Sequence, residues 1–197
     1  MHMLRVLVLV AMAVVGLPAG GAAQDLIVNG HFHTDINGWT LIGIGTQAWD
    51  PLDWQAVPSS GSIRVTNTDP TANMGTGSGQ CIALTPSGTY EFGAHVRFPA
   101  GQSLGAGGVA VGWFSNPTCT NPPISTTNTP AVFSTTVNTW VESFSSGVAA
   151  PPGTVAVGVG PGVVKLGAGG STAGLFDRVR FGPTGTTPVQ VQAFTVE

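Results

Sequence analysis

The sequence predicts an all-β protein, a two-sheet antiparallel jelly-roll β-sandwich of about 150 residues that follows an export signal. Apolar residues occur in short alternating runs that glycine or proline interrupts, and almost no stretch has the period of a helix. Near its two ends the chain also carries two segments typical of the first and last strands of such a sandwich, N-G-H-F-H-T-D-I-N-G-W over 29–39 and L-F-D-R-V-R-F over 175–181. Because such a sandwich lays its first and last strands side by side, these segments frame one domain, which we place at 24–182.

The first 23 residues have the pattern of a secretory signal peptide. Arg5 gives a positive start, 4–17 is an apolar run, and Gly21 to Ala23 are small residues suited to cleavage before Gln24. The apolar run is about 14 residues, too short for a hydrocarbon core that needs roughly 20. We therefore expect a secreted, extracytoplasmic protein without membrane insertion.

The charge balance argues against nucleic acid as a partner. Only 8% of the residues are charged, and without Arg5 the remaining basic residues face nine acidic ones. The 29 glycines and 15 prolines supply the turns of a β-protein. The remaining basic residues are Arg64, Arg97, Lys165, Arg178 and Arg180.

The chain has two cysteines, and both flank segments that are typical of strands. In an oxidising compartment this predicts one disulfide, Cys81 to Cys119, whose loop closure would stabilise the fold by roughly 4 kcal/mol. Two free buried thiols are the alternative. The spacing matches no zinc motif.

The clearest strand is 90–98, in which Tyr90, Phe92, Ala94, Val96 and Phe98 alternate with polar or small residues. That alternation predicts a sheet with one face exposed to water. The other expected strands are 26–32, 39–44, 62–65, 80–84, 109–114, 140–144, 154–159 and 175–181.

Two segments are expected to lie outside this pattern. The stretch 116–130 has four prolines among Ser, Thr and Asn, and we predict a long surface loop without a regular hydrogen-bond ladder. Residues 183–197 predict a linker followed by an extra strand, which could extend a sheet of this domain or of another chain.

Four motifs resemble carbohydrate-binding modules of the type appended to bacterial cellulases and xylanases, and more broadly the galactose-binding-like jelly rolls. They are an N-G-x-F opening that ends in G-W, a central P-S-G-T-Y-E-F, a late A-P-P-G-T-V-A-V and a closing F-D-x-V. The resemblance implies core roles for Phe32, Trp39 and Trp140, and a structural calcium ligand at Asp177. It covers most of 25–182.

The alternation of the last strand supports a buried Asp177, because this residue is in phase with Leu175, Val179 and Phe181. A buried carboxylate needs a cation or several hydrogen-bond donors. The alternatives are a bulge that turns Asp177 outward, or a hydrogen-bonded carboxylate without metal. The family often has Glu where this chain has His33, which removes one oxygen ligand.

The segment W-D-P-L-D-W offers the ingredients of a sugar site, two indoles and two carboxylates in one loop that Pro51 keeps from being a strand. In the alternative, the indoles pack beneath the loop and the Asp residues cap turns. Trp113 and Phe114 lie on opposite faces of one strand, so one belongs to the core and the other is available. The candidate ligand-binding residues are Trp49, Asp50, Asp53, Trp54 and Trp113.

Catalytic and metal-binding patterns are weaker, and we predict that the protein is not an enzyme. Asp50 and Asp53 are close enough in sequence for a glycosidase pair, but an exposed loop would not raise either pKa. His31 and His33 could bind a transition metal with His95, although nothing in the sequence brings His95 beside them.

The resulting hypothesis is a secreted, non-catalytic carbohydrate-binding protein with a polysaccharide as partner. The alternative is an extracellular structural or interaction protein whose jelly roll is a scaffold and whose C-terminal strand docks onto a protein partner. Exposed indoles at Trp49, Trp54 or Trp113 would favour the sugar, and buried indoles would favour assembly.

Overall fold

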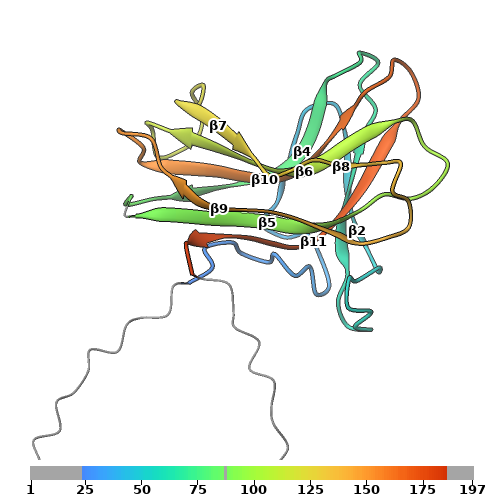
Figure 1. Ribbon diagram of the computed structural model, residues 1–197, viewed down its shortest axis with the longest axis horizontal. Coiled ribbons are helices and arrows are strands. Elements are labelled where there is room, and N and C mark those ends of the chain that lie inside the picture. The colour runs from blue at the N-terminus through green and yellow to red at the C-terminus, as the bar shows by residue number, and fades with distance from the viewer. Residues whose placement is uncertain (1–23, 87, 186–197) are drawn as a thin grey trace, which may run out of the picture.

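The computed structural model describes residues 24–86 and 88–185, which form two antiparallel β-sheets packed face to face (Figure 1). The predicted all-β jelly-roll sandwich is confirmed. Within these residues no helix is long and apolar enough to cross a membrane. The signal peptide and most of the predicted C-terminal linker and strand lie outside the described residues.

We call the two sheets the β10 sheet and the β11 sheet after their central strands. The β10 sheet has the order β1-β4-β10-β6-β7, and β8 also pairs with β6. Its strands are β1 (Thr40–Ile42), β4 (Gly75–Ala83), β6 (Gly105–Phe114), β7 (Ser125–Asn128), β8 (Val132–Phe133) and β10 (Ala156–Lys165). The β11 sheet has the order β2-β3-β11-β5-β9. Its strands are β2 (Gly45–Asp50), β3 (Ser62–Asn67), β5 (Thr89–Arg97), β9 (Val141–Ala149) and β11 (Thr172–Pro183).

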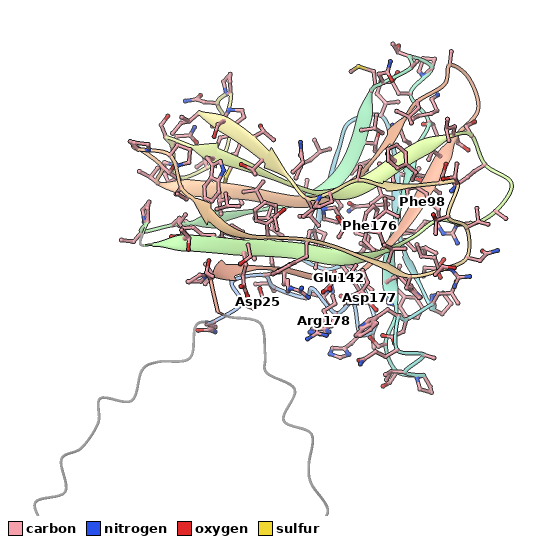
Figure 2. The ribbon with its side chains drawn as sticks, in the orientation of Figure 1. Asp25, Phe98, Glu142, Phe176, Asp177 and Arg178 are labelled. Carbon is pink, nitrogen blue, oxygen red and sulfur yellow. A yellow bond between two sulfur atoms is a disulfide. The ribbon has the colours of Figure 1, made fainter. Side chains whose placement is uncertain are left out.

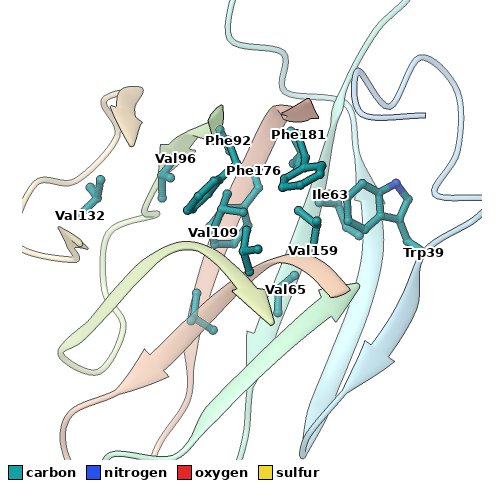
Figure 3. Close-up of a cluster of buried hydrophobic side chains, with 14 of the residues drawn as sticks. Trp39, Ile63, Val65, Phe92, Val96, Val109, Val132, Val159, Phe176 and Phe181 are labelled. Carbon is teal, nitrogen blue, oxygen red and sulfur yellow. The ribbon is translucent and has the colours of Figure 1, made fainter. Parts of the chain in front are cut away.

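The space between the sheets is filled by valines and aromatic rings, as Figure 3 shows. Trp113 from β6 lies at the centre of an aromatic group, with ring centroids 5.7 Å from Tyr90 and 6.1 Å from Phe181. The alternation predicted for 90–98 is confirmed, because all five of its apolar residues are buried. Phe32 and Trp39 are core residues as expected, whereas Trp140 is only half-buried.

The outer face of the β11 sheet is covered, contrary to the prediction of one wet face. Glu91 and His95 on β5 are buried, because the N-terminal segment and the 51–61 loop lie over them. The N-terminal segment hydrogen-bonds to β11, with Leu26 N donating to Phe181 O at 2.8 Å. The two ends of the domain therefore lie side by side, but 26–32 is not a strand, since Phe32 has φ of 46°.

The predicted disulfide is confirmed: Cys81 of β4 is bonded to Cys119, with 5.9 Å between the two Cα atoms. It ties the 115–124 loop to the β10 sheet. The expectation that 116–130 lacks a hydrogen-bond ladder is wrong in part, because β7 pairs with β6 from Ser125 onward. The Ser, Thr and Asn side chains of β7 are mostly exposed, which suits an edge strand.

The β10 sheet is sharply bent along its strands, so that its outer face is concave (Figure 1). At the bend Gly162 of β10 pairs with Gly77 of β4 on one side and with Gly108 of β6 on the other. Glycine lacks the side chain that resists tight bending, and the neighbouring Pro161 has no amide hydrogen to hold the ladder straight. A line of glycines therefore crosses three strands where the sheet folds.

Candidate functional site

A groove of about 690 Å³ occupies the concave outer face of the β10 sheet. Along β10 the side chains of Val157, Val159 and Val163 point into the core, so the alternate positions face outward. Those positions are glycines, and β4 and β6 repeat the pattern. The floor of the groove is formed by Gly77, Gly79, Gly108, Gly158, Gly160 and Gly162.

Phe114 forms one wall of the groove and is its aromatic residue. A Cβ atom placed on Gly112 or on Gly158 would lie 3.0 Å from Cε2 of Phe114, so the ring rests directly on these glycines. Cys119 and its neighbour Thr118 also line the groove. The disulfide therefore fixes part of the wall as well as the fold.

The opposite wall is aliphatic. Ile42 from β1 is 60% exposed, and its Cδ1 atom lies 2.8 Å from a Cβ atom placed on Gly79. Val164, at the end of β10, is 37% exposed and also lines the groove. Neither side chain is packed into the core, so both present apolar surface to whatever fills the groove.

None of the described residues that line the groove is charged. Several of its polar side chains already have partners inside the protein. The side-chain amide of Gln80 donates to Val28 O and accepts from Val28 N. The Thr129 hydroxyl accepts hydrogen bonds from Val109 N and from the Ser143 hydroxyl. Among the described residues, the lining side chains of Thr40 and Asn128 have no hydrogen-bond partner. The groove can thus offer apolar surface and a few neutral hydrogen-bonding groups, without acid, base or metal ligand.

The tryptophan-rich segment lies on the other side of the sandwich, against the outer face of the β11 sheet. Trp54 stacks on His95 with ring centroids 3.8 Å apart. Trp49 belongs to β2 and is 38% exposed, and its Nε1 donates to Phe32 O at 2.8 Å. Both indoles pack the loop onto the sheet, and neither reaches the groove.

The two carboxylates of this segment stabilise local structure. Asp50 is buried, forms an ion pair with Arg64 at 2.6 Å and accepts a hydrogen bond from Leu52 N. Asp53 accepts hydrogen bonds from Gln55 N and Val57 N, as a turn-capping residue does. This arrangement matches the alternative of packed indoles and turn-capping aspartates.

The assignment of Trp113 as a ligand-binding residue is wrong, since its side chain is completely buried in the core. One of the two neighbours is core and the other is available, and the available one is Phe114, which lines the groove.

Asp177 is buried, but not for the reason that alternation suggested. A β-bulge between Asp177 and Arg180 shifts the register of β11, so Phe176 rather than Asp177 shares the core with Val179. Asp177 faces the covered outer side, beneath the sheet in Figure 2, and its carboxylate accepts hydrogen bonds from Trp54 N and Arg178 N. Burial raises the pKa of Asp177 to about 7.

The hydrogen bonds of Asp177 do not require a calcium ion. Both oxygens of Asp177 accept amide hydrogens, which satisfies the carboxylate in the way that the metal-free alternative requires. The described residues contain no group of three or more His, Cys, Asp or Glu side chains that could hold a metal. The calcium ion stays a prediction without support from the geometry.

The three histidines do not form the imidazole site that the sequence allowed. His31 and His33 stack on each other with centroids 5.9 Å apart, whereas His95 stacks on Trp54. Burial lowers the pKa of His95 to about 4, and its Nδ1 atom is buried without a partner within the described structure.

The groove glycines were not predicted from the sequence, although a signal was present. In 156–162, A-V-G-V-G-P-G, small residues alternate with two valines and a proline. In 75–79 glycines alternate with Thr and Ser, and in 108–112 small residues alternate with valines. A strand with valine on one face and glycine on the other has a core face and a bare face. The bare faces of three neighbouring strands make a concave surface that no single strand reveals.

No family model and no curated protein matches the chain. Solved structures with the same fold include the module TmCBM61 in complex with β-1,4-galactotriose, at 13% identity and a TM-score of 0.55, covering 80% of this chain and 97% of that one. The C-terminal family 22 carbohydrate-binding module of Clostridium thermocellum Xyn10B, in which conserved residues of a cleft have a role in ligand binding, has 16% identity and a TM-score of 0.54. The match covers 81% of this chain and 99% of that one.

A third structure contains the CBM22-1 and GH10 modules of the Clostridium thermocellum xylanase Xyn10B with xylohexaose, at 13% identity and a TM-score of 0.58. The match covers 81% of this chain but only 28% of that protein. At these identities the likeness is one of fold. The chain has the jelly-roll fold of carbohydrate-binding modules, as the sequence motifs indicated.

Proposed function

We propose that the protein is a secreted, non-catalytic polysaccharide-binding protein and that its ligand lies in the groove of the β10 sheet. The groove carries this proposal: it is concave, solvent-open and uncharged, and its volume is in the range of ligand-binding sites. Two proteins of the same fold were determined with oligosaccharides, which supports a sugar as the ligand class.

The chemistry of the groove suits sugar binding better than sugar cleavage. Phe114 provides a flat apolar surface of the kind that covers the apolar face of a pyranose ring. A glycosidase needs two positioned carboxylates, and the groove lining that the structure describes contains no carboxylate. The Cys81–Cys119 disulfide supports an extracytoplasmic location, where such bonds form and persist.

Replacing Phe114 by Ala should weaken binding of a neutral polysaccharide by at least about tenfold, because the ligand loses the aromatic wall of the groove. Affinity gel electrophoresis against xylan, galactan and mixed-linkage β-glucan measures this directly. The matched control is Phe133→Ala, since Phe133 is 48% exposed on β8 and does not line the groove. Equal retention of the Phe114 variant and the unchanged protein would contradict the proposal.

Replacing Trp49 by Ala should leave polysaccharide binding unchanged, although the sequence makes this indole one of the candidate ligand-binding residues. Its ring lies over Gly61 on the β11 sheet side, away from the groove. The variant is compared with the unchanged protein in the same gels, after its fold is checked by circular dichroism. Loss of binding in a folded variant would show that the sugar binds on the β11 sheet side, which contradicts the proposal.

A further inference from the structure

We propose that the groove selects a neutral polysaccharide whose hydroxyls are masked by O-acetyl groups. This inference rests on the proposed function and specifies the class of glycan. It follows from a mismatch between the hydroxyls that an unsubstituted sugar chain carries and the hydrogen-bonding groups that the groove offers.

The floor of the groove has almost no free hydrogen-bonding capacity. Its glycines belong to three adjacent strands: β10 pairs with β6 along its whole length, and it pairs with β4 except between Val159 and Gly162, where Pro161 has no amide hydrogen. Apart from this interruption, the floor presents Cα hydrogens and peptide groups that are already bonded. A sugar hydroxyl directed at this surface would lose water without gaining a partner, which costs about 1–3 kcal/mol per group in protein sites.

The walls provide little more. Thr40 and Asn128 are the lining side chains without internal partners in the described structure. They lie at the two opposite edges of the sheet, where Thr40 pairs with Gly79 and Asn128 pairs with Ala110. Ile42, Val164 and Phe114 present apolar surface instead. An acetyl ester replaces a hydroxyl donor by a methyl and a carbonyl, so it removes the unpaired donor and covers this surface.

The uncharged lining restricts the ligand further. Among the described residues that line the groove there is no lysine or arginine to neutralise a uronic acid or a sulfate ester, and burying such an anion without a counter-ion is strongly unfavourable. An O-acetylated neutral chain meets all three conditions: it has no net charge, few hydroxyls toward the protein, and apolar substituents toward Ile42 and Val164.

The decisive experiment uses one polymer in two states. Acetylated xylan and acetylated glucomannan are each split, and one half is de-esterified with mild alkali, which leaves the backbone intact. Isothermal titration of the full chain should give affinities at least about fivefold higher for the acetylated half of each pair. Equal affinity for both halves would overturn the inference and leave the proposed function standing. Absence of binding to all four polymers, and to a wider neutral panel, would overturn both.

A wall variant tests whether the preference comes from this groove. Val164→Thr is isosteric and, combined with Ile42→Thr, adds hydroxyls to the apolar wall. It should reduce the acetyl preference to near one, because the acetylated chain loses the apolar wall that its substituents contact. The control is Val155→Thr, because Val155 is 39% exposed and does not line the groove. An unchanged preference in the double variant would overturn the inference.

Discussion

Replacing Cys81 and Cys119 together by Ser should lower the free energy of unfolding by about 4 kcal/mol, a large share of the stability of a domain of this size. The bond joins residues 38 positions apart and restricts the unfolded chain accordingly. Urea denaturation of the double variant, followed by tryptophan fluorescence, measures the change. A loss below about 1 kcal/mol would show that the loop closure contributes little.

The same variant should also bind polysaccharide less well at temperatures where it remains folded. Cys119 and Thr118 line the groove, and the 115–124 loop is held to β4 by the disulfide. Local hydrogen bonds, such as Thr118 N to Asn116 Oδ1, fix the turn but not its position against the sheet. Reduction of the unchanged protein with dithiothreitol is the parallel measurement. Undiminished binding by the double variant and by the reduced protein would show that the disulfide does not shape the binding groove.

The fold was predictable from the sequence wherever a strand has one apolar face. In β5 every second residue from Tyr90 is buried as expected, and the two cysteines pair as expected. The exposure of the other face was not predictable. Whether Glu91 and His95 contact water depends on loops from 24–39 and 51–61 that cross the sheet, and their path is set by long-range packing.

The last strand shows a second limit. Strict alternation predicts that Asp177 shares a face with Val179 and Phe181, and the bulge in β11 breaks that phase. Arg178 adopts a left-handed conformation at the bulge, with φ of 48°, which no residue pattern near it indicates. A bulge moves the residues before it to the opposite face of the sheet from the one that strict alternation predicts. The extra residue in β11 therefore places the Asp177 carboxylate on the outer face instead of in the core.

The candidate site was predicted least well, because sequence reasoning gave weight to side chains with obvious chemistry. Trp49 and Trp54 are conspicuous in the sequence, but they serve packing on the β11 sheet. The groove depends on glycines, whose contribution is the surface left bare between the walls. That contribution becomes visible only when the register places Gly77, Gly162 and Gly108 in one line.

Asp177→Asn and His95→Phe should change the pH dependence of stability in opposite directions. Burial raises the pKa of Asp177 to about 7 from 3.8, so the folded state binds a proton that the unfolded state has lost, and this carboxyl destabilises the fold as pH rises from about 4 to 7. Burial lowers the pKa of His95 to about 4 from 6.5, so the unfolded state binds the extra proton, and stability is lost as pH falls from 6.5 to about 4.

In the unchanged protein the two effects oppose each other over nearly the same range, so this pair contributes a flat profile between about pH 4 and 6.5. Without the Asp177 carboxyl, stability should rise with pH by up to about 1.4 kcal/mol per unit in that range. Without the His95 imidazole it should fall with pH at a similar rate, while Phe retains a ring to stack on Trp54 and removes the unpartnered Nδ1.

Urea midpoints measured at half-unit steps from pH 4 to 8 distinguish these outcomes. The slopes of stability against pH are compared rather than the absolute stabilities, because Asn can accept only one of the two amide hydrogens that Asp177 accepts. Glu142, Arg178 and Arg180 also act on His95, the first raising and the other two lowering its pKa, and they are present in every variant. The double variant should regain the pH dependence of the unchanged protein between about pH 4 and 6.5. Parallel profiles for the two single variants would show that the carboxyl and the imidazole do not titrate as their burial requires.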